Sequence, residues 1–454
     1  MTSRRAATPA PVARLAPIAV AALVGLLGMP ACAPSAAPAD GVPIVNTIDT
    51  TTVEEPGAPL PSGLPEILPE PVRTGIDIIR SEGPGPLAGL RVGLITNHTG
   101  VDRTGRSTID ILASLPRMEL VALFGPEHGI RGAAQAGVTV EGGRDAPTGL
   151  PIFSLYDSTR APTASELANI DALAFDMQDV GARYYTYIWT MALAMRAAAA
   201  HDRLFVVLDR PNPIRGDIVQ GNVQDSAFLS FLGLYPMAMR HGMTVAEVAH
   251  WLNEEHGIDA RLVVVPMRGW RRSLSWEETG LFFTPPSPNM PSPVSALHYP
   301  GTCLFEQTSL SVGRGLPTAF QQIGAPWLDH EELARRLNAM ELPGVRFETL
   351  LFPAVDPGRQ SHLGERVPGE RRGVRFIATD PVAYDPTRTA VAALVEVARM
   401  HPDRLEFSAN FDYIAGNARL RAQVLAGADA ETITSGWDEA RASFEAARAG
   451  YLLY

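Results

Sequence analysis

The sequence predicts an α/β protein with a doubly wound parallel sheet, followed by a smaller α/β or α+β C-terminal domain. Between residues 75 and 265, short apolar runs alternate with stretches of helical spacing. The runs are apolar throughout, as expected for strands that helices cover on both faces. Polar residues follow several runs directly. Right-handed crossovers place the carboxyl ends of parallel strands along one edge, so these residues are expected to share a ligand crevice.

Six strands and four helices are expected in the first domain. The strands are expected at 91–96, 120–124, 151–156, 171–175, 204–208 and 261–265. The helices are expected at 107–115, 163–170, 188–200 and 244–255. Thr163 with Glu166, and Thr244 with Glu247, have capping-box spacing at two helix starts. The alanine-rich run 188–200 has high helix propensity.

A proline-dense stretch, 284–301, is expected to be a long ordered loop that crosses between two domains. The predicted boundaries are 73–284 for the first domain and 285–454 for the second. In the second domain, strands are expected at 345–352 and 374–379, and helices at 331–340, 387–400, 418–426 and 438–449.

The N-terminus is typical of an exported protein. Three arginines precede an apolar run at 15–28, which is too short to span a bilayer easily and fits the core of a signal peptide. The run leads into Met-Pro-Ala-Cys, which is similar to a bacterial lipobox with Met29 where leucine is usual. The sequence therefore predicts a lipoprotein signal peptide at 1–31, lipidation of Cys32, and a periplasmic or extracytoplasmic location with a lipid anchor as the only membrane contact. Plain secretion is the alternative.

Residues 32–72 are rich in proline, alanine, glycine, threonine and acid, without sustained periodicity, and are expected to form a disordered tether. The 454 residues exceed one ordinary domain. The formal net charge of −11 argues against nucleic acid as a partner, because phosphate binding requires a basic surface.

Groups of polar residues follow four of the expected strands. They are Asn97 and His98; Glu127 and His128; Asp176, Gln178 and Asp179; and Asp209, Arg210 and Asn212. Helix caps and turns can account for single members of this set, but less readily for all four groups. Glu127 lies on a glycine-rich loop that lets a ligand approach the backbone closely, and it is the first candidate for a catalytic group.

Several reaction classes lack their sequence signatures. Residues 97–102 do not supply the Gly-x-Gly-x-x-Gly turn of dinucleotide-binding folds, and both a phosphate-binding P-loop and a Gly-x-Ser-x-Gly elbow are missing. Cys32 and Cys303 are the only cysteines, and neither belongs to a metal or redox motif. His98 and His128 lack the spacing of metal ligands. Neither a metal nor a cofactor is therefore expected.

Glycoside hydrolysis requires an acid that protonates the leaving oxygen and a second group that attacks or activates water. Glu127 can supply the acid. The candidates for its partner are Asp176, Asp179, Asp209 and Glu306, the last of which follows the proline-dense stretch. Nearby aromatic residues can either stack on sugars or pack in the core; they are Tyr184, Tyr185, Tyr187 and Trp189.

Five ordered motifs stand out along the chain: Phe-Gly-Pro-Glu-His-Gly at 124–129, Asp-Met-Gln-Asp-Val-Gly-Ala-Arg-Tyr-Tyr-Thr-Tyr at 176–187, Leu-Asp-Arg-Pro-Asn-Pro at 208–213, Arg-His-Gly-Met-Thr at 240–244 and Ile-Gly-Ala-Pro-Trp at 323–327. Through these motifs the chain, from about residue 73 onward, resembles the NamZ-type exo-β-N-acetylmuramidases of peptidoglycan-recycling bacteria. The resemblance implies release of N-acetylmuramic acid from the non-reducing end of peptidoglycan fragments. It also implies a Rossmann-like domain, a smaller C-terminal domain, an active site in the cleft between them, and Glu127 as the catalytic acid.

The second catalytic step has open alternatives. The substrate's own 2-acetamido group, oriented by Asp176 or Asp179, can attack, or one of these acids or Glu306 can activate water. The expected substrate-binding residues are Asn97, His128, Gln178, Asp179, Arg183, Tyr187, Asp209, Arg210 and Asn212. Among them the arginines suit the lactyl carboxylate, although each can equally form a structural ion pair.

A non-catalytic lipoprotein that binds cell-wall glycan is the alternative function.

The chain departs from the family pattern at two places. Family members tend to have Gly-Gly where this chain has Arg215 and Gly216, and a Ser-Glu-Gly-Arg-Gly-Thr-like run where it has Ser309-Leu-Ser-Val-Gly-Arg-Gly. These departures, at Arg215, Ser309 and Val312, are expected to affect subsite preference more than reaction class.

Overall fold

The computed structural model describes residues 70–454, apart from residues 128, 131–141, 157–159, 356–362 and 367–368. The predicted signal peptide, Cys32, His128 and nearly all of the predicted tether lie outside the described residues. None of the helices in the described ranges has the length and hydrophobicity that a membrane span requires. The described residues belong to one compact unit.

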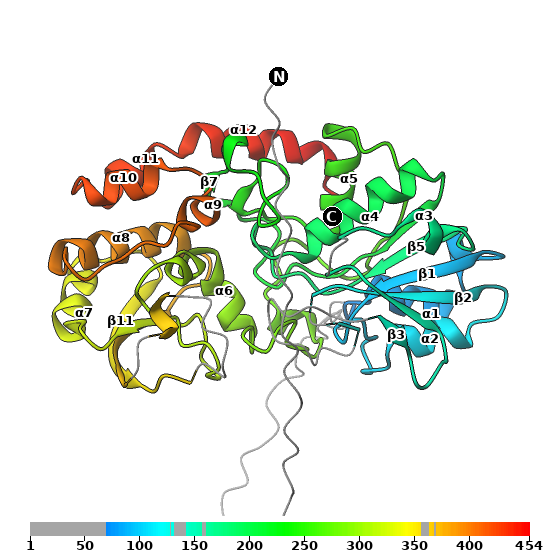
Figure 1. Cartoon of the computed structure of the whole chain (residues 1–454), viewed down its shortest axis with the longest axis horizontal. Helices are drawn as coiled ribbons and strands as arrows, with labels where there is room; N and C mark the ends of the chain where they lie inside the picture. The colour runs from blue at the N-terminus through cyan, green and yellow to red at the C-terminus, as the bar shows by residue number, and fades with distance from the viewer. Residues whose placement is uncertain (1–69, 128, 131–141, 157–159, 356–362, 367–368) are drawn as a thin grey trace, which may run out of the picture. The chain divides into compact units, whose positions relative to one another are not determined.

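The first domain is built on a seven-stranded sheet with the order β3-β4-β2-β1-β5-β6-β9 (Figure 1). All neighbouring strands are parallel except β3 and β4. The bounds are β1 Arg91–Thr96, β2 Glu119–Gly125, β3 Gly143–Arg144, β4 Pro151–Ser154, β5 Ala172–Asp176, β6 Leu204–Leu208 and β9 Arg261–Val265. Without β3, this is the strand order of doubly wound dinucleotide-binding folds, so the predicted fold class is confirmed.

Two hydrophobic clusters cover the two faces of this sheet. Successive strand residues alternate between them: Leu94 belongs to one cluster and Ile95 to the other. Helices α1 (Gly75–Glu82) and α2 (Thr108–Ser114) pack on the first face. Helices α3 (Ala164–Leu167), α4 (Tyr187–Ala200) and α5 (Val245–Glu255) pack on the second. Burial on both faces explains why the strands are apolar throughout.

The predicted capping boxes are both present: Thr163 and Thr244 exchange hydrogen bonds with Glu166 and Glu247. Helix α1 was not predicted. It begins with a third capping box, between Thr74 and Asp77.

The second domain holds an antiparallel sheet with the order β10-β12-β11, which makes it an α+β domain. Its strands are β10 Gln322–Ala325, β11 Val345–Phe352 and β12 Arg371–Ala378. Its helices are α6 Pro293–Thr302, α7 His330–Ala339, α8 Pro386–Met400, α9 Phe411–Ala415, α10 Arg419–Leu425, α11 Ala430–Ser435 and α12 Asp438–Arg448. Strands β11 and β12 and helices α7, α8, α10 and α12 lie close to their predicted positions.

The prediction of a loop throughout 284–301 was wrong for its second half. Ser292 caps helix α6 by accepting a hydrogen bond from the Ser295 backbone, and Pro293 occupies the first helical position. Proline is favoured there because its missing N–H would have no partner within the helix and its φ is already helical. The proline-rich loop therefore ends before Ser292, instead of running to residue 301 as predicted. Below, residues 284–290 are called the strap.

After the second domain the chain returns to the first. The Leu453 backbone donates to Glu247 Oε1 at 2.8 Å, and the Tyr454 hydroxyl donates to Asp209 Oδ2 at 2.7 Å. Arg448 donates to the Gly242 carbonyl at 2.6 Å. Residues of both domains also belong to one hydrophobic cluster. The two domains thus share a core.

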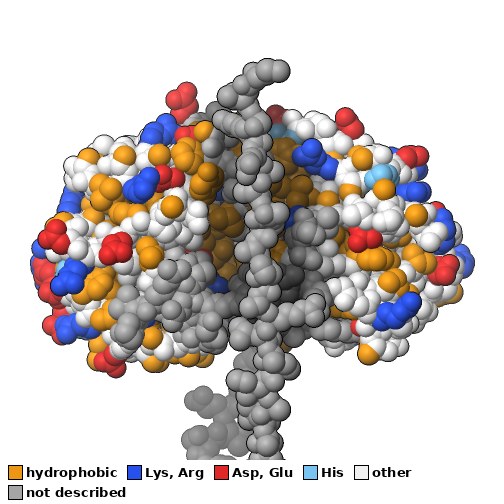
Figure 2. All heavy atoms as spheres, viewed as in Figure 1, with side chains coloured by type: hydrophobic (Ala, Val, Ile, Leu, Met, Phe, Trp, Pro, Cys, Tyr) orange, Lys and Arg blue, Asp and Glu red, His pale blue; other side chains and the backbone are white. Residues whose placement is uncertain are grey.

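Charged side chains of both signs are interspersed among apolar ones on the face of the described residues shown in Figure 2. That face therefore offers no concentrated single-sign field for a polyanion.

Candidate active site

A cavity of about 250 Å³ joins the carboxyl edge of the sheet to the second domain. The first domain contributes residues that follow β2, β4 and β5, and the second contributes residues of α6, α9 and the 3₁₀ turn Cys303–Gln307 (η4). The lining consists of Glu127, Tyr156, Tyr184, Tyr185, Thr186, Leu232, Ser287, Asn289, Met290, Tyr299, Cys303, Glu306, Gln307, Arg314, Phe320 and Ile414. Glu127 and Glu306 are the only carboxyl groups among these described residues.

The Glu127 side chain is held at the cavity wall by a hydroxyl. Thr186 Oγ1 donates to Glu127 Oε2 at 2.9 Å, from the turn that precedes α4. Burial raises the pKa of Tyr156, and the charge of Glu127 and a hydrogen bond to it raise this pKa further. Tyr156 is therefore a neutral phenol beside the carboxylate. One threonine and one tyrosine thus fix the position of Glu127.

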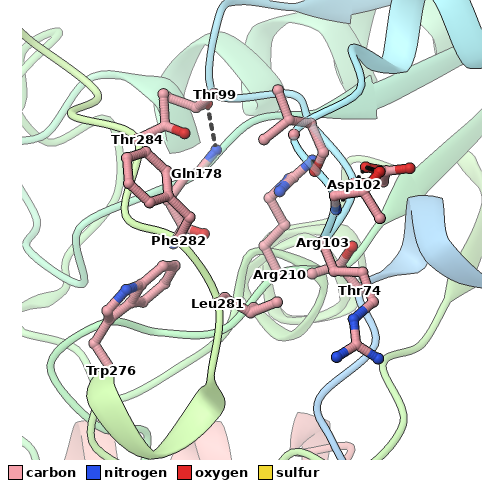
Figure 3. Close-up of a pocket in the computed structure, with 13 residues that line it drawn as sticks. Thr74, Thr99, Asp102, Arg103, Gln178, Arg210, Trp276, Leu281, Phe282 and Thr284 are labelled. Atoms are coloured by element: carbon pink, nitrogen blue, oxygen red, sulfur yellow. Dashed lines mark hydrogen bonds between the residues drawn. The ribbon is translucent and has the colours of Figure 1, made fainter.

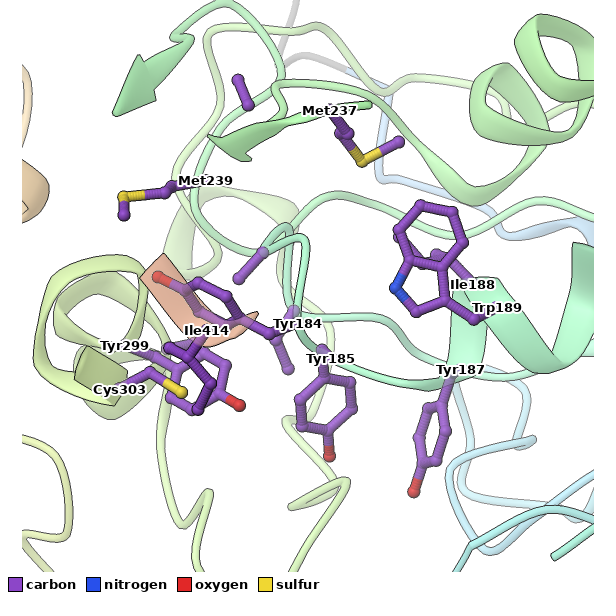
Figure 4. Close-up of a cluster of buried hydrophobic side chains, with 14 of the residues drawn as sticks. Tyr184, Tyr185, Tyr187, Ile188, Trp189, Met237, Met239, Tyr299, Cys303 and Ile414 are labelled. Carbon is purple, nitrogen blue, oxygen red and sulfur yellow. The ribbon is translucent and has the colours of Figure 1, made fainter. Parts of the chain in front are cut away.

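The cavity has an aromatic wall made of rings that pack on one another (Figure 4). The rings of Tyr185 and Tyr299 are edge to face at 6.0 Å, and those of Tyr299 and Phe320 at 4.8 Å. Tyr184 and Tyr187 pack against the same group and are buried. Trp189 is also buried and donates to the Arg183 carbonyl at 2.6 Å. Of the four predicted aromatic candidates, Tyr184 and Tyr185 line the cavity, whereas Tyr187 and Trp189 lie behind it.

Glu306 enters the same cavity from η4 and is only 7% exposed. It forms an ion pair with Arg314 Nη1, and the Cys303 thiol donates to its Oε2 at 3.5 Å. Burial raises the pKa of Cys303 well above its usual value, and Glu306 adds to that effect. The thiol therefore stays protonated and serves as a donor.

Asp176 lies elsewhere, at the carboxyl end of β5. Its Oδ1 accepts from Arg210 Nε at 2.5 Å and its Oδ2 from Arg210 Nη2 at 2.8 Å. Thr108 Oγ1 also donates to Oδ2, and Arg210 donates to the Val101 carbonyl at 2.9 Å. Asp176 is fully buried and does not line the cavity of Glu127. This ion pair occupies the edge between β1 and β5, where doubly wound folds bind their ligand.

Asp209 and Asn212 also belong to buried networks. Asp209 accepts hydrogen bonds from the backbone N–H groups of Arg210 and Ala246 and from the hydroxyls of Thr244 and Tyr454. Burial raises the pKa of Asp209 to about 7. Asn212 bridges its own turn: its side chain accepts from the Ile214 backbone at 3.0 Å and donates to the Met243 carbonyl at 2.9 Å.

Arg183 joins the two domains. Its guanidinium is fully buried and donates to the carbonyls of Met237 at 3.1 Å and of Ile414, in α9, at 2.7 Å. Burial lowers the pKa of Arg183 to about 10. Its position is that of a structural brace.

The other predicted residues surround the strap. His98 Nε2 lies 2.7 Å from the Pro285 carbonyl oxygen, and the Tyr187 hydroxyl donates to the Pro286 carbonyl at 2.6 Å. Asn97 Oδ1 accepts from the Thr99 backbone at 2.9 Å. The strap is therefore fixed directly over the sheet edge.

Gln178 donates to the Pro211 carbonyl at 2.7 Å and lines a second cavity. Asp179 Oδ2 accepts from the Gly181 backbone at 2.7 Å and lies 3.4 Å from His241 Nε2. The structure therefore brings Glu127 and Glu306 into one cavity and places the other described candidates in the networks around it. Of these, Gln178 and Arg210 also line the second cavity.

Thr186, Tyr156, Asn289 and Arg314 were not singled out from the sequence. Thr186 lies within the motif at 176–187, and Arg314 lies within the run that departs from the family pattern. The hydroxyls of Thr186 and Tyr156 and the guanidinium of Arg314 carry no local signature, because the fold brings them to their acid partners. Asn289 accepts a hydrogen bond from the Gly315 backbone at 2.8 Å.

The two departures from the family pattern have local effects. Arg215 has a φ of 74°, in the left-handed region that favours glycine. Its guanidinium is held by Asp217, at 3.0 and 2.6 Å from the two carboxylate oxygens. Ser309 donates to the Arg404 carbonyl at 2.9 Å, and Val312 is buried in the core.

Comparison with known proteins gives matches over both domains. The N-terminal and C-terminal family models of the exo-beta-N-acetylmuramidase NamZ match residues 92–294 and 297–454. The curated peptidoglycan beta-N-acetylmuramidase NamZ of Bacillus subtilis (strain 168) is 42% identical over 385 residues, covering 84% of this chain and 91% of that protein.

Two crystal structures of DUF1343 family proteins from Bacteroides fragilis NCTC 9343 share the fold. One is 36% identical with a TM-score of 0.77, and the other is 27% identical with a TM-score of 0.65. Each comparison covers 84% of this chain and 99% of the other. The motifs, the two-domain fold and these matches agree, and the chain belongs to the NamZ family of exo-β-N-acetylmuramidases.

Proposed function

We propose that this protein hydrolyses peptidoglycan fragments and releases N-acetylmuramic acid from their non-reducing ends, with Glu127 as the general acid. The observation that carries the proposal is the position of Glu127 in the wall of a cavity between the two domains. The cavity is concave and combines an aromatic wall with several polar and charged groups, as expected for a site that binds one sugar unit.

In the proposed mechanism Glu127 gives its proton to the glycosidic oxygen as the bond to the anomeric carbon breaks. Thr186 limits the rotation of the carboxyl through its hydrogen bond to Oε2. Holding an acid in reactive geometry lowers the barrier because the entropy of alignment is lost before the reaction. The buried aromatic wall reduces the space for water around the reacting bond.

The attacking group is either the 2-acetamido group of the substrate or a water molecule that Glu306 activates. Asp176 is unsuited to both roles, since bidentate Arg210 and Thr108 already occupy its two oxygens. The buried Glu306 and the half-buried Arg314 form an ion pair in the cavity. We propose that this pair orients polar groups of the sugar, and that Asp176, Asp209, Arg183, Arg210 and Asn212 maintain the fold.

Turnover of the disaccharide N-acetylmuramyl-β-1,4-N-acetylglucosamine tests the proposal. The native protein is expected to release N-acetylmuramic acid, and Glu127→Gln is expected to bind the disaccharide without cleaving it. Glu254→Gln, an exposed position on α5, is the matched control and should retain full activity. A native protein that binds the disaccharide without turnover would instead favour a non-catalytic glycan-binding lipoprotein.

Glu306→Gln separates the two modes of attack. If the acetamido group attacks, this variant retains substantial turnover and the product retains its anomeric configuration. If Glu306 activates water, turnover falls as steeply as in Glu127→Gln. Proton NMR of the first product anomer distinguishes retention from inversion.

We further propose that the chain is exported and held at a membrane by lipid on Cys32. The apolar run at 15–28 and the lipobox-like sequence that follows it support this proposal. Labelling with a radioactive fatty acid in the producing cells should mark the native chain and not Cys32→Ser. Equal labelling of both chains would contradict the assignment.

A further inference from the structure

A second cavity, of about 190 Å³, borders the strap at Thr284 (Figure 3). It is formed by the loop after β1, by side chains that follow β5 and β6, and by the loop from Trp276 to Thr284. The lining consists of Thr74, Thr99, Val101, Asp102, Arg103, Thr104, Gly105, Gln178, Arg210, Trp276, Leu281, Phe282 and Thr284. The function proposed above leaves this cavity unused.

Phe282 is the most exposed large hydrophobic side chain of the described residues, at 82%. Its loop is well packed: Trp276 is buried, its ring meets that of Phe283 edge to face at 5.2 Å, and Thr279 donates to the Trp276 carbonyl at 2.6 Å. The loop therefore holds Phe282 outward in a fixed position. An aromatic ring held beside a cavity offers a flat apolar face on which the apolar face of a ligand can stack.

Polar groups lie beside this ring. Gln178 and Thr99 are joined by a hydrogen bond of 2.9 Å from the Gln178 backbone to the Thr99 hydroxyl, and both line the cavity. Arg103 is exposed and forms no side-chain ion pair within the described part of the chain. A pyranose chain with acidic substituents has apolar ring faces, hydroxyls and carboxylates. In this cavity the aromatic ring suits the first, the hydrogen-bonding groups suit the second and the cation suits the third.

The two cavities are adjacent along the strap. Thr284 lines the second cavity and Ser287 lines the cavity of Glu127. Three residues span at most about 11 Å, even when fully extended. His98 and Tyr187 fix the carbonyls of the two prolines in between, so this separation is set by the fold. One glycan chain can therefore contact both cavities.

We infer that the second cavity is a glycan-binding subsite, in which Phe282 and Arg103 hold the part of the peptidoglycan strand on the reducing-end side of the bond that Glu127 cleaves. The inference rests on the proposed function, since it takes the cleaved bond to lie at Glu127. Phe282 stacks on a sugar ring, and Arg103 pairs with the carboxylate of a further muramic acid. The enzyme thus prefers strands longer than a disaccharide.

Isothermal titration with the Glu127→Gln protein tests the inference without turnover. The probes are the disaccharide described above and the tetrasaccharide with two such units. We expect tighter binding of the tetrasaccharide. Phe282→Ala should weaken its binding roughly threefold to tenfold, the usual range for loss of one aromatic contact, and leave disaccharide binding unchanged. Leu351→Ala, which alters another exposed hydrophobic side chain at 55% exposure, is the matched control and should change neither value.

Arg103→Gln gives a second readout. It should weaken binding of the tetrasaccharide and not of a chitin tetrasaccharide, which has no carboxylate. Equal tetrasaccharide affinity with and without the Phe282 ring would overturn the inference. Binding that depends on Phe282 only when the glycan carries stem peptides would overturn it too, because the occupant would then be peptide. A failure of the proposed function is distinct: the native protein would release no N-acetylmuramic acid from the disaccharide.

Discussion

Two acids, Glu127 and Asp176, lie at the carboxyl ends of β2 and β5, which are separated in the sheet by β1 alone, and the fold uses them in opposite ways. Asp176 is fully buried, and three donated hydrogen bonds, two of them from a bidentate arginine, occupy its oxygens. Glu127 accepts from Thr186 and faces a cavity. A buried carboxylate that is fully paired cannot be removed without leaving its partner charge unpaired, whereas a carboxylate that faces a cavity is available to a substrate. On the proposed function, the catalytic centre lies at the end of β2, whereas the end of β5 is occupied by the ion pair of Asp176 with Arg210.

The largest expected effect is on kcat and comes from Glu127, the acid that faces the cavity. Glu127→Gln should lower kcat on the disaccharide about 10²- to 10⁴-fold, the range for loss of a general acid, with little change in melting temperature. Product release by chromatography and thermal unfolding by circular dichroism provide the two measurements. A variant with normal kcat would remove Glu127 from the mechanism.

Substitution of the buried acid, Asp176, is expected to lower the free energy of unfolding rather than kcat. Asp176→Asn leaves Arg210 buried without its countercharge, which should cost about 3–5 kcal/mol of unfolding free energy. Chemical denaturation measures this loss. Any protein that remains folded should retain most of its kcat, in contrast to Glu127→Gln. Wild-type stability together with a severe loss of kcat would reverse the roles assigned to the two acids.

Asp209, another buried acid, is expected to make the stability of the protein depend on pH. Burial raises its pKa to about 7 from an unfolded value of 3.8, so the folded state binds a proton that the unfolded state releases between these values. The contribution of Asp209 is therefore fully present below pH 3.8 and is lost as the pH rises through 7, by about 1.4 kcal/mol per pKa unit. Denaturation at pH 5 and pH 8 should show a smaller difference in Asp209→Asn than in the native protein. An unchanged difference would contradict the assigned shift.

The smallest effect concerns the residue that positions Glu127. Thr186→Val removes the hydroxyl that donates to Oε2 and should lower kcat about tenfold with a nearly unchanged KM. Thr186→Ser should restore most of the rate, which a purely structural role of the side chain would not require. A change confined to KM would assign Thr186 to substrate binding instead.

Local patterns predicted most of the fold. The six strands are apolar runs, and the capping boxes of Thr163 and Thr244 mark helix starts through contacts three residues apart. Helix α6 was missed because its prolines suggested a loop, although Pro293 is favoured at a helix start.

The candidate site was less predictable because its contacts join distant parts of the sequence. Thr186 meets Glu127 across 59 residues, and Arg210 meets Asp176 across 34. Sequence reasoning located acids at strand ends but could not tell a paired acid from one that faces a cavity. That distinction depends on which donor the fold brings to each carboxylate.

The return of residues 448–454 to the first domain has a consequence for biosynthesis. Asp209 and Glu247 receive hydrogen bonds from Leu453 and Tyr454, which a ribosome adds only after the helices and the sheet of the second domain. During vectorial synthesis the first domain thus lacks two of its stabilising contacts until those residues emerge. Such high contact order slows folding, because the entropy of bringing distant segments together is lost before their contacts stabilise the chain. The proposed export would benefit from this delay, because a chain that folds slowly stays open for passage through a translocation channel.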